Sequence, residues 1–346
     1  MSGILSSQRR AVGIWLLICT LVVYFMIMIG GITRLTQSGL SMVEWEPIMG
    51  IIPPLNEHDW LESFEKYKAF PEYQKVNKGM SLQEYKGIFL WEYGHRVLGR
   101  FIGILFLLPY LFFLFRGYLP GKWKWKLLTA FALGGLQGLM GWYMVKSGLV
   151  NNPHVSQYRL AAHFGIALAI FVLLFWYSLE FLRGDQRRSG LVHLRKTSSY
   201  VLILVLFMMM TGAFVAGTKA GHIYNTFPLI AGAWLPDGLL SLEPIWRNFF
   251  ENSLTIQFVH RCIAYCIVIA VLYLFAVGWR STKENSQLNI RFELTLVLFL
   301  MLCQVAFGII TLLMKVPVFW GALHQSTAVA LLASLIFLTH KVCRND

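Results

Sequence analysis

The chain has 346 residues, of which 57% are hydrophobic and only 14% are charged, and its mean hydropathy is +0.59. This is too little polar surface to cover a water-soluble globule, so the composition excludes a soluble enzyme and favours an integral membrane protein. The formal net charge of +13 does not require nucleic acid as a partner, because a basic inner face suits anionic membrane lipid.

Eight apolar stretches, taken in chain order, are long enough to cross a hydrocarbon core about 30 Å thick, which needs roughly 20 helical residues. They lie near residues 11–32, 89–115, 127–146, 158–182, 198–217, 254–279, 292–314 and 318–340. We therefore predict an all-α integral membrane fold with eight transmembrane helices. The first stretch lacks the small-residue cleavage site of a signal peptide, so we expect it to be retained.

The distribution of basic residues predicts the orientation of these helices. Sixteen of the 30 Lys and Arg residues flank the helix ends that share a side with the N-terminus. By the positive-inside rule, both termini are expected in the cytoplasm. The N-terminus lacks an Arg-rich, Ser-rich amphipathic transit stretch, which favours the plasma (inner) membrane of a bacterium over the mitochondrial inner membrane.

The loop after the first helix, residues 34–87, is long and rich in aromatic residues. Loops of this length are usually functional or disordered, and aromatic side chains favour the membrane interface. We predict an ordered outer cap that includes Trp45, Trp60, Phe64 and Tyr67.

The sequence repeats itself at about half its length, which is the signature of a duplicated structural unit. The matching stretches are Glu-Tyr-Gly-His95-Arg96 with Gln-Phe-Val-His260-Arg261, and Leu-Ala-Ala-His163 with Gly-Ala-Leu-His324. We predict two pseudo-symmetric four-helix bundles, residues 1–190 and 191–346, with the N- and C-termini inside. Because each half has an even number of spans, an axis along the membrane normal should relate them.

The four repeated histidines are the strongest functional signal. Each lies about seven residues inside the outer end of its predicted helix, so at about 1.5 Å per residue all four sit about 10 Å below the outer surface. A polar side chain at this depth indicates a functional site, and imidazole is a common axial ligand of haem iron. We predict that His95 with His163, and His260 with His324, each bind a haem iron. A hydrogen bond to a neighbouring helix would explain one such histidine better than four at matched depth, and zinc would need further ligands.

One position breaks the repeat in an informative way. Glu92 lies three residues before His95, on the same helix face and one turn nearer the outside. Its counterpart in the second half is Gln257, which cannot carry a proton at physiological pH. This asymmetry suggests that the first half performs chemistry and the second holds a permanent cofactor, although an interfacial anchor is an alternative for Glu92. Arg96 and Arg261 are candidate partners of haem propionates, or cations that reach lipid headgroups.

The residues resemble the haem A synthase family over nearly the whole chain. The resemblance is carried by Gly-Gly-Ile-Thr-Arg-Leu-Thr-Gln-Ser-Gly-Leu-Ser-Met from Gly30, Trp45-Glu-Pro, Gly50-Ile-Ile-Pro-Pro, and Trp91-Glu-Tyr-Gly-His-Arg-Val-Leu-Gly-Arg100. The outer loops lack the cysteine pairs of some family members, so the chain resembles the cysteine-free branch found in mitochondria and many bacteria.

The resemblance implies an oxidoreductase that converts the C8 methyl of haem O to the formyl of haem A, for use in terminal oxidases. It also implies that His260 and His324 hold a resident haem b, that His95 and His163 bracket the substrate haem, and that Glu92 is the catalytic acid or base. These sites are expected towards the outer side of the membrane. The implied partners are a haem O synthase that supplies the substrate, an electron-transfer partner and membrane lipid, with room for a homo-oligomer.

Two other functions fit the same histidine pattern. A dihaem b-type electron-transfer cytochrome would also place two histidine pairs in helix bundles, but it has no need of Glu92 opposite Gln257. A haem transporter or assembly factor that binds without reacting would contain a single haem species.

Overall fold

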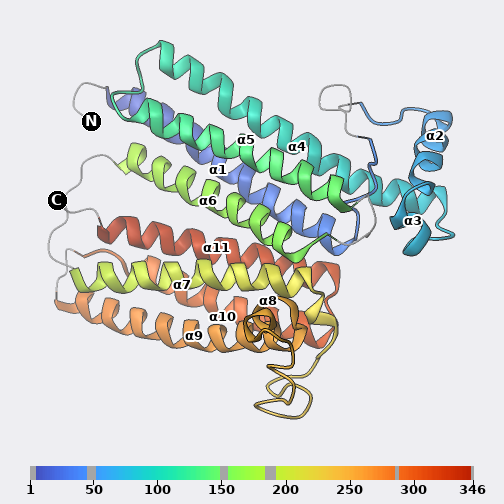
Figure 1. Cartoon of the computed structure of the whole chain (residues 1–346). Coiled ribbons are helices and arrows are strands. Elements are labelled where there is room, and N and C mark those ends of the chain that lie inside the picture. Colours follow the sequence, from blue (N-terminus) through green and yellow to red (C-terminus); the bar gives the residue numbers. More distant parts are fainter. Residues whose placement is uncertain (1–4, 45–51, 149–154, 184–191, 285–287, 344–346) are drawn as a thin grey trace.

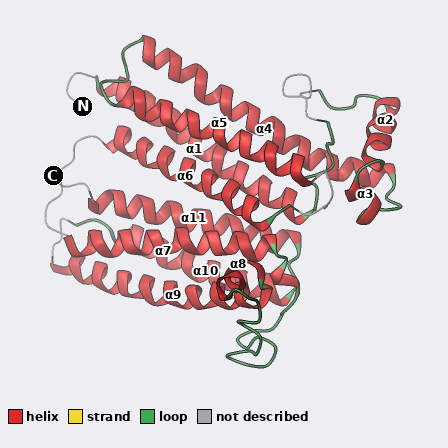
Figure 2. Ribbon diagram, in the orientation of Figure 1, coloured by secondary structure: helices red, strands yellow, loops and turns green. Residues whose placement is uncertain are grey.

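The structure is a computed structural model that describes residues 5–44, 52–148, 155–183, 192–284 and 288–343 (Figure 1). The described residues form helices joined by loops, as Figure 2 shows. An all-α fold is what long apolar segments must adopt in lipid, because a helix satisfies its own backbone hydrogen bonds.

Eight of the helices are long and apolar enough to cross a membrane, which confirms the predicted number. They are α1 (Ser6–Leu35), α4 (Leu82–Phe115), α5 (Trp123–Gly148), α6 (Gln157–Arg183), α7 (Val192–Gly217), α9 (Ser253–Glu284), α10 (Arg291–Leu313) and α11 (Val318–Cys343). The shorter elements are α2 (Glu57–Lys68), α3 (Pro71–Lys75), α8 (Asn248–Glu251) and the 3₁₀ turns η2 (Ala220–His222) and η3 (Ile245–Arg247).

The long helices form two rings of four. In the first ring, α1 and α5 each contact both α4 and α6, and in the second, α7 and α10 each contact both α9 and α11. The rings meet where α1 packs on α11, α6 packs on α7, and α6 packs on α11. The set of contacts stays the same when α1 is exchanged with α7, α4 with α9, α5 with α10, and α6 with α11. A two-fold axis between α6 and α11 would relate the two halves in this way.

Both termini lie at one end of the helices, and α2, α3 and α8 lie at the other (Figure 1). We call the latter the outer end. Its assignment to the extracytoplasmic side, with the termini in the cytoplasm, stays a prediction from the distribution of basic residues.

Polar contacts as well as apolar packing connect the two halves. The side-chain amide of Gln325 on α11 donates to the carbonyl of Ile27 on α1 at 2.8 Å. Gly31 makes this approach possible, because a Cβ at that position would overlap the Gln325 amide. The Tyr24 hydroxyl also donates to the carbonyl of Ser326 at 3.3 Å. Because lipid is as apolar as a leucine side chain, close packing and such hydrogen bonds carry helix association in a membrane.

Helix α4 begins at Leu82, seven residues before its predicted start. Ser81 caps it, with Glu84 completing a capping box, so the helix extends beyond the apolar stretch. His95 therefore lies thirteen residues after the start of its helix, whereas the other three histidines lie six or seven residues after theirs. The predicted distance from the helix end is wrong for His95, because hydropathy reports only the apolar part of α4.

The outer extension of α4 is covered by an aromatic cluster. The rings of Phe64 and Tyr67 on α2 stack on Tyr85, with ring centroids 5.0 and 5.1 Å apart, and Trp60 packs edge-on against Phe89. The prediction that this loop is ordered is confirmed for Trp60, Phe64 and Tyr67, while Trp45 lies outside the described residues.

A buried carboxyl lies within this outer cap. Glu72 on α3 is only 5% exposed and accepts a hydrogen bond from the Tyr67 hydroxyl at 3.3 Å. Burial, followed by the nearby charge of Glu92, raises the pKa of Glu72 from 4.5 to about 8. Glu72 is thus largely protonated at neutral pH.

The stability of the outer cap should depend on the ionisation of Glu72. Because its folded pKa is raised, the folded cap holds the proton more tightly than the unfolded chain, and this stabilisation is lost as the pH rises from about 4.5 through about 8. We expect amide hydrogen exchange in residues 57–75, corrected for intrinsic rates, to be faster at pH 9 than at pH 6. Glu72→Gln should remove the difference, whereas Glu65→Gln, at an exposed site on α2, should keep it. An unchanged pH response in Glu72→Gln would contradict this account.

Candidate functional site

The four predicted histidines come together as two pairs. His95 on α4 and His163 on α6 occupy opposite corners of the first ring, and His260 on α9 and His324 on α11 occupy the matching corners of the second. All four side chains are partly buried. Each bundle therefore presents two imidazoles across its interior.

Each histidine ring packs against a glycine of a neighbouring helix. A Cβ would lie 2.8 Å from a ring atom at Gly308, so the ring would have to move, and 3.1 Å away at Gly30 and Gly141, where the ring must give slightly. At Gly212 it would lie 3.4 Å away, in ordinary van der Waals contact. The pairs are His95 with Gly30, His163 with Gly141, His260 with Gly212, and His324 with Gly308. Because these glycines, which we call the glycine cradle, repeat together with the histidines, both belong to the duplicated unit.

One glutamine accompanies the histidine pair in the interior of each bundle. The Nε2 atom of Gln137 lies 3.2 Å from His163 Nε2, and that of Gln304 lies 3.4 Å from His324 Nε2. The Oε1 atoms of both glutamines are buried and have no hydrogen-bond partner among the described residues. A buried acceptor without a partner is costly, so these atoms indicate that each interior is built to hold a ligand with polar groups.

The hydrogen bonds of the second half fix which ring nitrogen is available as a ligand. His324 Nδ1 lies 3.2 Å from the backbone carbonyl of Gln304, and His260 Nδ1 lies 2.8 Å from Thr211 Oγ1. A carbonyl only accepts, and the Thr211 hydroxyl already donates to the Met208 carbonyl at 2.8 Å. Both Nδ1 atoms therefore carry the proton, and each Nε2 atom has the lone pair. That of His324 faces the Gln304 side-chain amide, and that of His260 has no hydrogen-bond partner among the described residues.

The first half lacks these restraints. The position equivalent to Thr211, by the register that relates Gly30 to Gly212, is Ile29, which cannot accept a hydrogen bond from its side chain. His163 Nδ1 is buried without a hydrogen-bond partner in the described ranges, and His95 makes no hydrogen bond to any residue that the structure describes. The histidine rings of the first half are thus held by fewer hydrogen bonds than those of the second.

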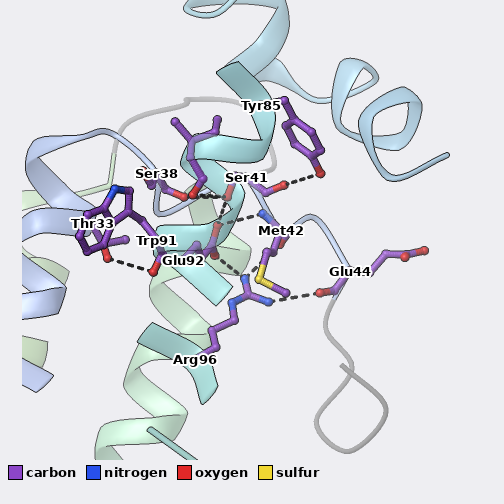
Figure 3. A network of polar contacts seen from close by, with 10 residues as sticks. Thr33, Ser38, Ser41, Met42, Glu44, Tyr85, Trp91, Glu92 and Arg96 are labelled. Atoms are coloured by element: carbon purple, nitrogen blue, oxygen red, sulfur yellow. Dashed lines mark hydrogen bonds and ion pairs between the residues drawn. The ribbon is translucent and has the colours of Figure 1, made fainter. Parts of the chain in front are cut away.

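Glu92 lies at the centre of a polar network next to the first pair (Figure 3). Its side chain is 2% exposed. Its Oε1 atom accepts from the Arg96 guanidinium at 2.6 Å, and its Oε2 atom accepts from Ser41 Oγ at 2.7 Å and the Met42 amide at 2.9 Å. Sequence reasoning missed Ser41 and Met42, although both lie in the distinctive run that begins at Gly30.

The equivalent residue in the second half, Gln257, makes similar hydrogen bonds but carries no charge. Gln257 accepts from Arg261 at 2.7 Å and donates to the Ala220 carbonyl at 2.8 Å, so it also attaches its helix to the preceding loop. At this position, next to the histidine pair, the first half thus has a buried carboxylate and the second half has an amide.

Arg96 and Arg261 have equivalent contacts in the two halves. Arg96 donates to the Met42 carbonyl at 3.0 Å, and Arg261 donates to the Tyr224 carbonyl at 3.3 Å. These contacts show each guanidinium fastening an outer loop to a long helix. Their contact with haem propionates stays a prediction.

Comparison with known proteins identifies the family. Residues 13–336 match the COX15-CtaA family, described as "Cytochrome oxidase assembly protein". The chain belongs to this family. It is 47% identical to a protein of Nitrosospira multiformis named "Heme A synthase" over 97% of this chain and 94% of that protein. Proteins of the same name from Nitrosomonas eutropha and Paramagnetospirillum magneticum are each 45% identical, over 97% and 99% of this chain and 95% and 97% of theirs.

These relatives confirm the resemblance seen in the sequence. This member of the COX15-CtaA family carries its four histidines, its glycine cradles and Glu92 within the matched residues.

The glycine cradle makes a direct prediction for Gly308→Ala. The new Cβ would lie 2.8 Å from His324 Cε1, and the ring cannot turn away without losing its bond to the Gln304 carbonyl. Overpacking of this kind costs about 1–3 kcal/mol. Thermal unfolding of the purified protein in detergent should show that loss. Gly134→Ala, inside α5 at a position with no atom within 4 Å of the new Cβ, should not lower the midpoint, because alanine favours the helix more than glycine does. Equal midpoints for the two variants would contradict the cradle.

Proposed function

We propose that this protein is a haem A synthase, an oxidoreductase that converts the C8 methyl of haem O to a formyl group. The observation that carries the proposal is a duplicated pair of intramembrane histidines with a buried carboxylate beside one pair only. The relatives that share 45–47% of its residues carry the name of this activity.

The two halves are proposed to have different tasks. His260 and His324 would hold a resident haem b, because hydrogen bonds commit their Nδ1 protons and leave the lone pairs on their Nε2 atoms. His95 and His163 would bind the substrate haem O, and their looser restraint suits a molecule that must enter and leave. The residues fit a haem in both halves, since each half offers two facing imidazoles and a glycine cradle.

Oxidation of the methyl group sets the chemical requirements of the first half. If the oxygen comes from water, conversion of a methyl group and one water to a formyl group releases four electrons and four protons. Bound haem b would supply a one-electron redox centre from which electrons pass to an acceptor outside this chain. We propose that Glu92 accepts a proton as the methyl carbon is oxidised.

The network around Glu92 supports this role. Arg96, Ser41 and the Met42 amide fix the carboxylate at two oxygen atoms, so it cannot swing away from the site. Burial excludes bulk water, which makes a positioned base more effective and limits side reactions. Gln257 could not perform this role in the second half, because an amide does not titrate at physiological pH.

The setting of the protein follows from the same proposal. It would receive haem O from a haem O synthase in the same membrane and deliver haem A for assembly of a terminal oxidase. Its eight spans make it a multi-pass membrane protein, and the bacterial relatives favour a bacterial plasma membrane.

The substitution Glu92→Gln tests the proposed chemistry. We expect the variant to bind haem b and haem O but to stop at haem O or an alcohol intermediate, because the amide cannot take up the proton. The measurement is chromatographic separation of haems from cells that also produce haem O. Ser41→Ala is the matched control: it removes one hydrogen bond to the charged Glu92, worth about 1.5–3 kcal/mol, and keeps the carboxylate. Unchanged haem A output in Glu92→Gln would refute the role.

The substitution Thr211→Val tests the assignment of the resident site. Losing the acceptor for the Nδ1 proton makes His260 a weaker donor to iron, so the midpoint potential of haem b should rise. Thr211→Ser should restore the wild-type value, because it keeps the hydroxyl. A potentiometric titration followed by absorbance measures both. No shift in Thr211→Val would show that this hydrogen bond does not act on a ligand of haem b.

A further inference from the structure

A cavity of about 410 Å³ opens at the outer end where the two halves meet. It lies within the range of about 300–1,000 Å³ that is usual for ligand sites. Helices α1, α5 and α6 of the first half and the end of α7 of the second half contribute to its lining. The polar lining includes Arg34, Ser147, Ser156, Arg159, Thr218 and Lys219.

The lining carries three positive charges and no carboxylate. Arg34, Arg159 and Lys219 make no ion pair with any residue that the structure describes. Like charges gathered at the edge of a low-dielectric region repel one another strongly. An arrangement of this kind indicates a site for an anion.

The three cations are only partly engaged by the protein. Arg34 donates to the Ala216 carbonyl at 3.0 Å, but its Nε atom is buried without a partner in the described part of the chain. Arg159 donates to Ser147 and stacks on the Tyr143 ring, 5.0 Å from its centroid. The Lys219 ammonium makes no hydrogen bond within the described residues. Donors therefore remain for a ligand with several acceptor oxygens.

The position of the cavity relates it to the first histidine pair. Arg159 lies four residues before His163 on α6, so the two side chains share a helix face and Arg159 is one turn nearer the outer end. An anion in the cavity would thus lie outward of His163. Haem carries two propionate carboxylates on one edge, and Arg and Lys are suited to bind them.

We propose that this cavity binds the propionates of the substrate haem, with Arg159 and Lys219 as the principal cations and Arg34 completing the set. The inference rests on the proposed function, since it takes the haem bound by His163 as the ligand. It assigns these residues a role in orienting the substrate. With the carboxylates fixed at the outer end of the helices, only the opposite edge of the macrocycle can extend into the first bundle.

The test compares ferric haem O with its dimethyl ester, in which both carboxylates are blocked. The full-length protein, with its resident haem, is titrated with each compound in nanodiscs of phosphatidylcholine, and binding is followed by absorbance. Charge-assisted hydrogen bonds to carboxylates should make the free acid bind at least about tenfold more tightly. The double variant Arg159→Gln/Lys219→Gln should bind acid and ester equally.

Two further variants keep the result interpretable. Lys219→Gln alone should reduce the preference for the acid, and it replaces a side chain without hydrogen bonds in the described residues, so it tests the site even if the double variant fails to fold. Lys146→Gln is the control: this exposed cation at the outer end of α5 stacks on Trp142 outside the cavity and should leave the preference unchanged.

The outcomes separate the possible ligands. Equal binding of acid and ester by the unaltered protein, or a preference that survives in both cavity variants, would overturn the inference. A lipid headgroup in the cavity would also overturn it. Two results together would show this: the preference for the acid is lost in discs of anionic phosphatidylglycerol, and lipid co-purifies with the unaltered protein but not with the variants that lack the cavity cations. Failure of the folded protein to bind either compound would refute the proposed function itself.

Discussion

The cost of placing a polar group inside a membrane governs this structure. The four imidazoles face the bundle interiors, because the surrounding lipid offers no hydrogen-bond partner. Each ring packs there against a glycine, namely Gly30, Gly141, Gly212 or Gly308. The same constraint requires Glu92 to take three donors from the segment around it and from its own helix.

Duplication followed by a few replacements explains how one fold can serve two tasks. The frame is common to both halves: Arg96 and Arg261 fasten the outer loops at equivalent carbonyls. The differences are concentrated next to the histidines. Thr211 faces His260 where the first half has Ile29, and Gln257 replaces Glu92. Under the proposed function, these two changes suit a firmly held haem in the second half and an exchangeable haem beside a carboxylate in the first.

Much of this architecture is encoded in simple sequence patterns. Hydropathy predicts the eight spans because a helix in lipid needs a minimum apolar length, and the repeat predicts the histidine pairs because equivalent positions occupy equivalent corners. The early start of α4 escaped prediction, since its outer two turns are stabilised by Ser81 and by aromatic contacts of Tyr85, not by lipid.

The finer parts of the site depend on distances that sequence spacing does not contain. The proton positions on His260 and His324 follow from contacts with α7 and with the α10 backbone, which belong to other helices. The basic cavity brings Arg34, Arg159 and Lys219 together from three separate helix ends. No periodicity in one segment reports such an arrangement.

The central claim is that the first half binds an exchangeable haem and the second a resident one. Haem transfer from the purified protein to an excess of apomyoglobin, with the species identified by chromatography at each time, tests it most directly. The account predicts a fast phase that contains haem O or haem A and is absent in His163→Ala, and a much slower phase that contains haem b. A single phase for all haems, or haem b leaving first, would contradict it.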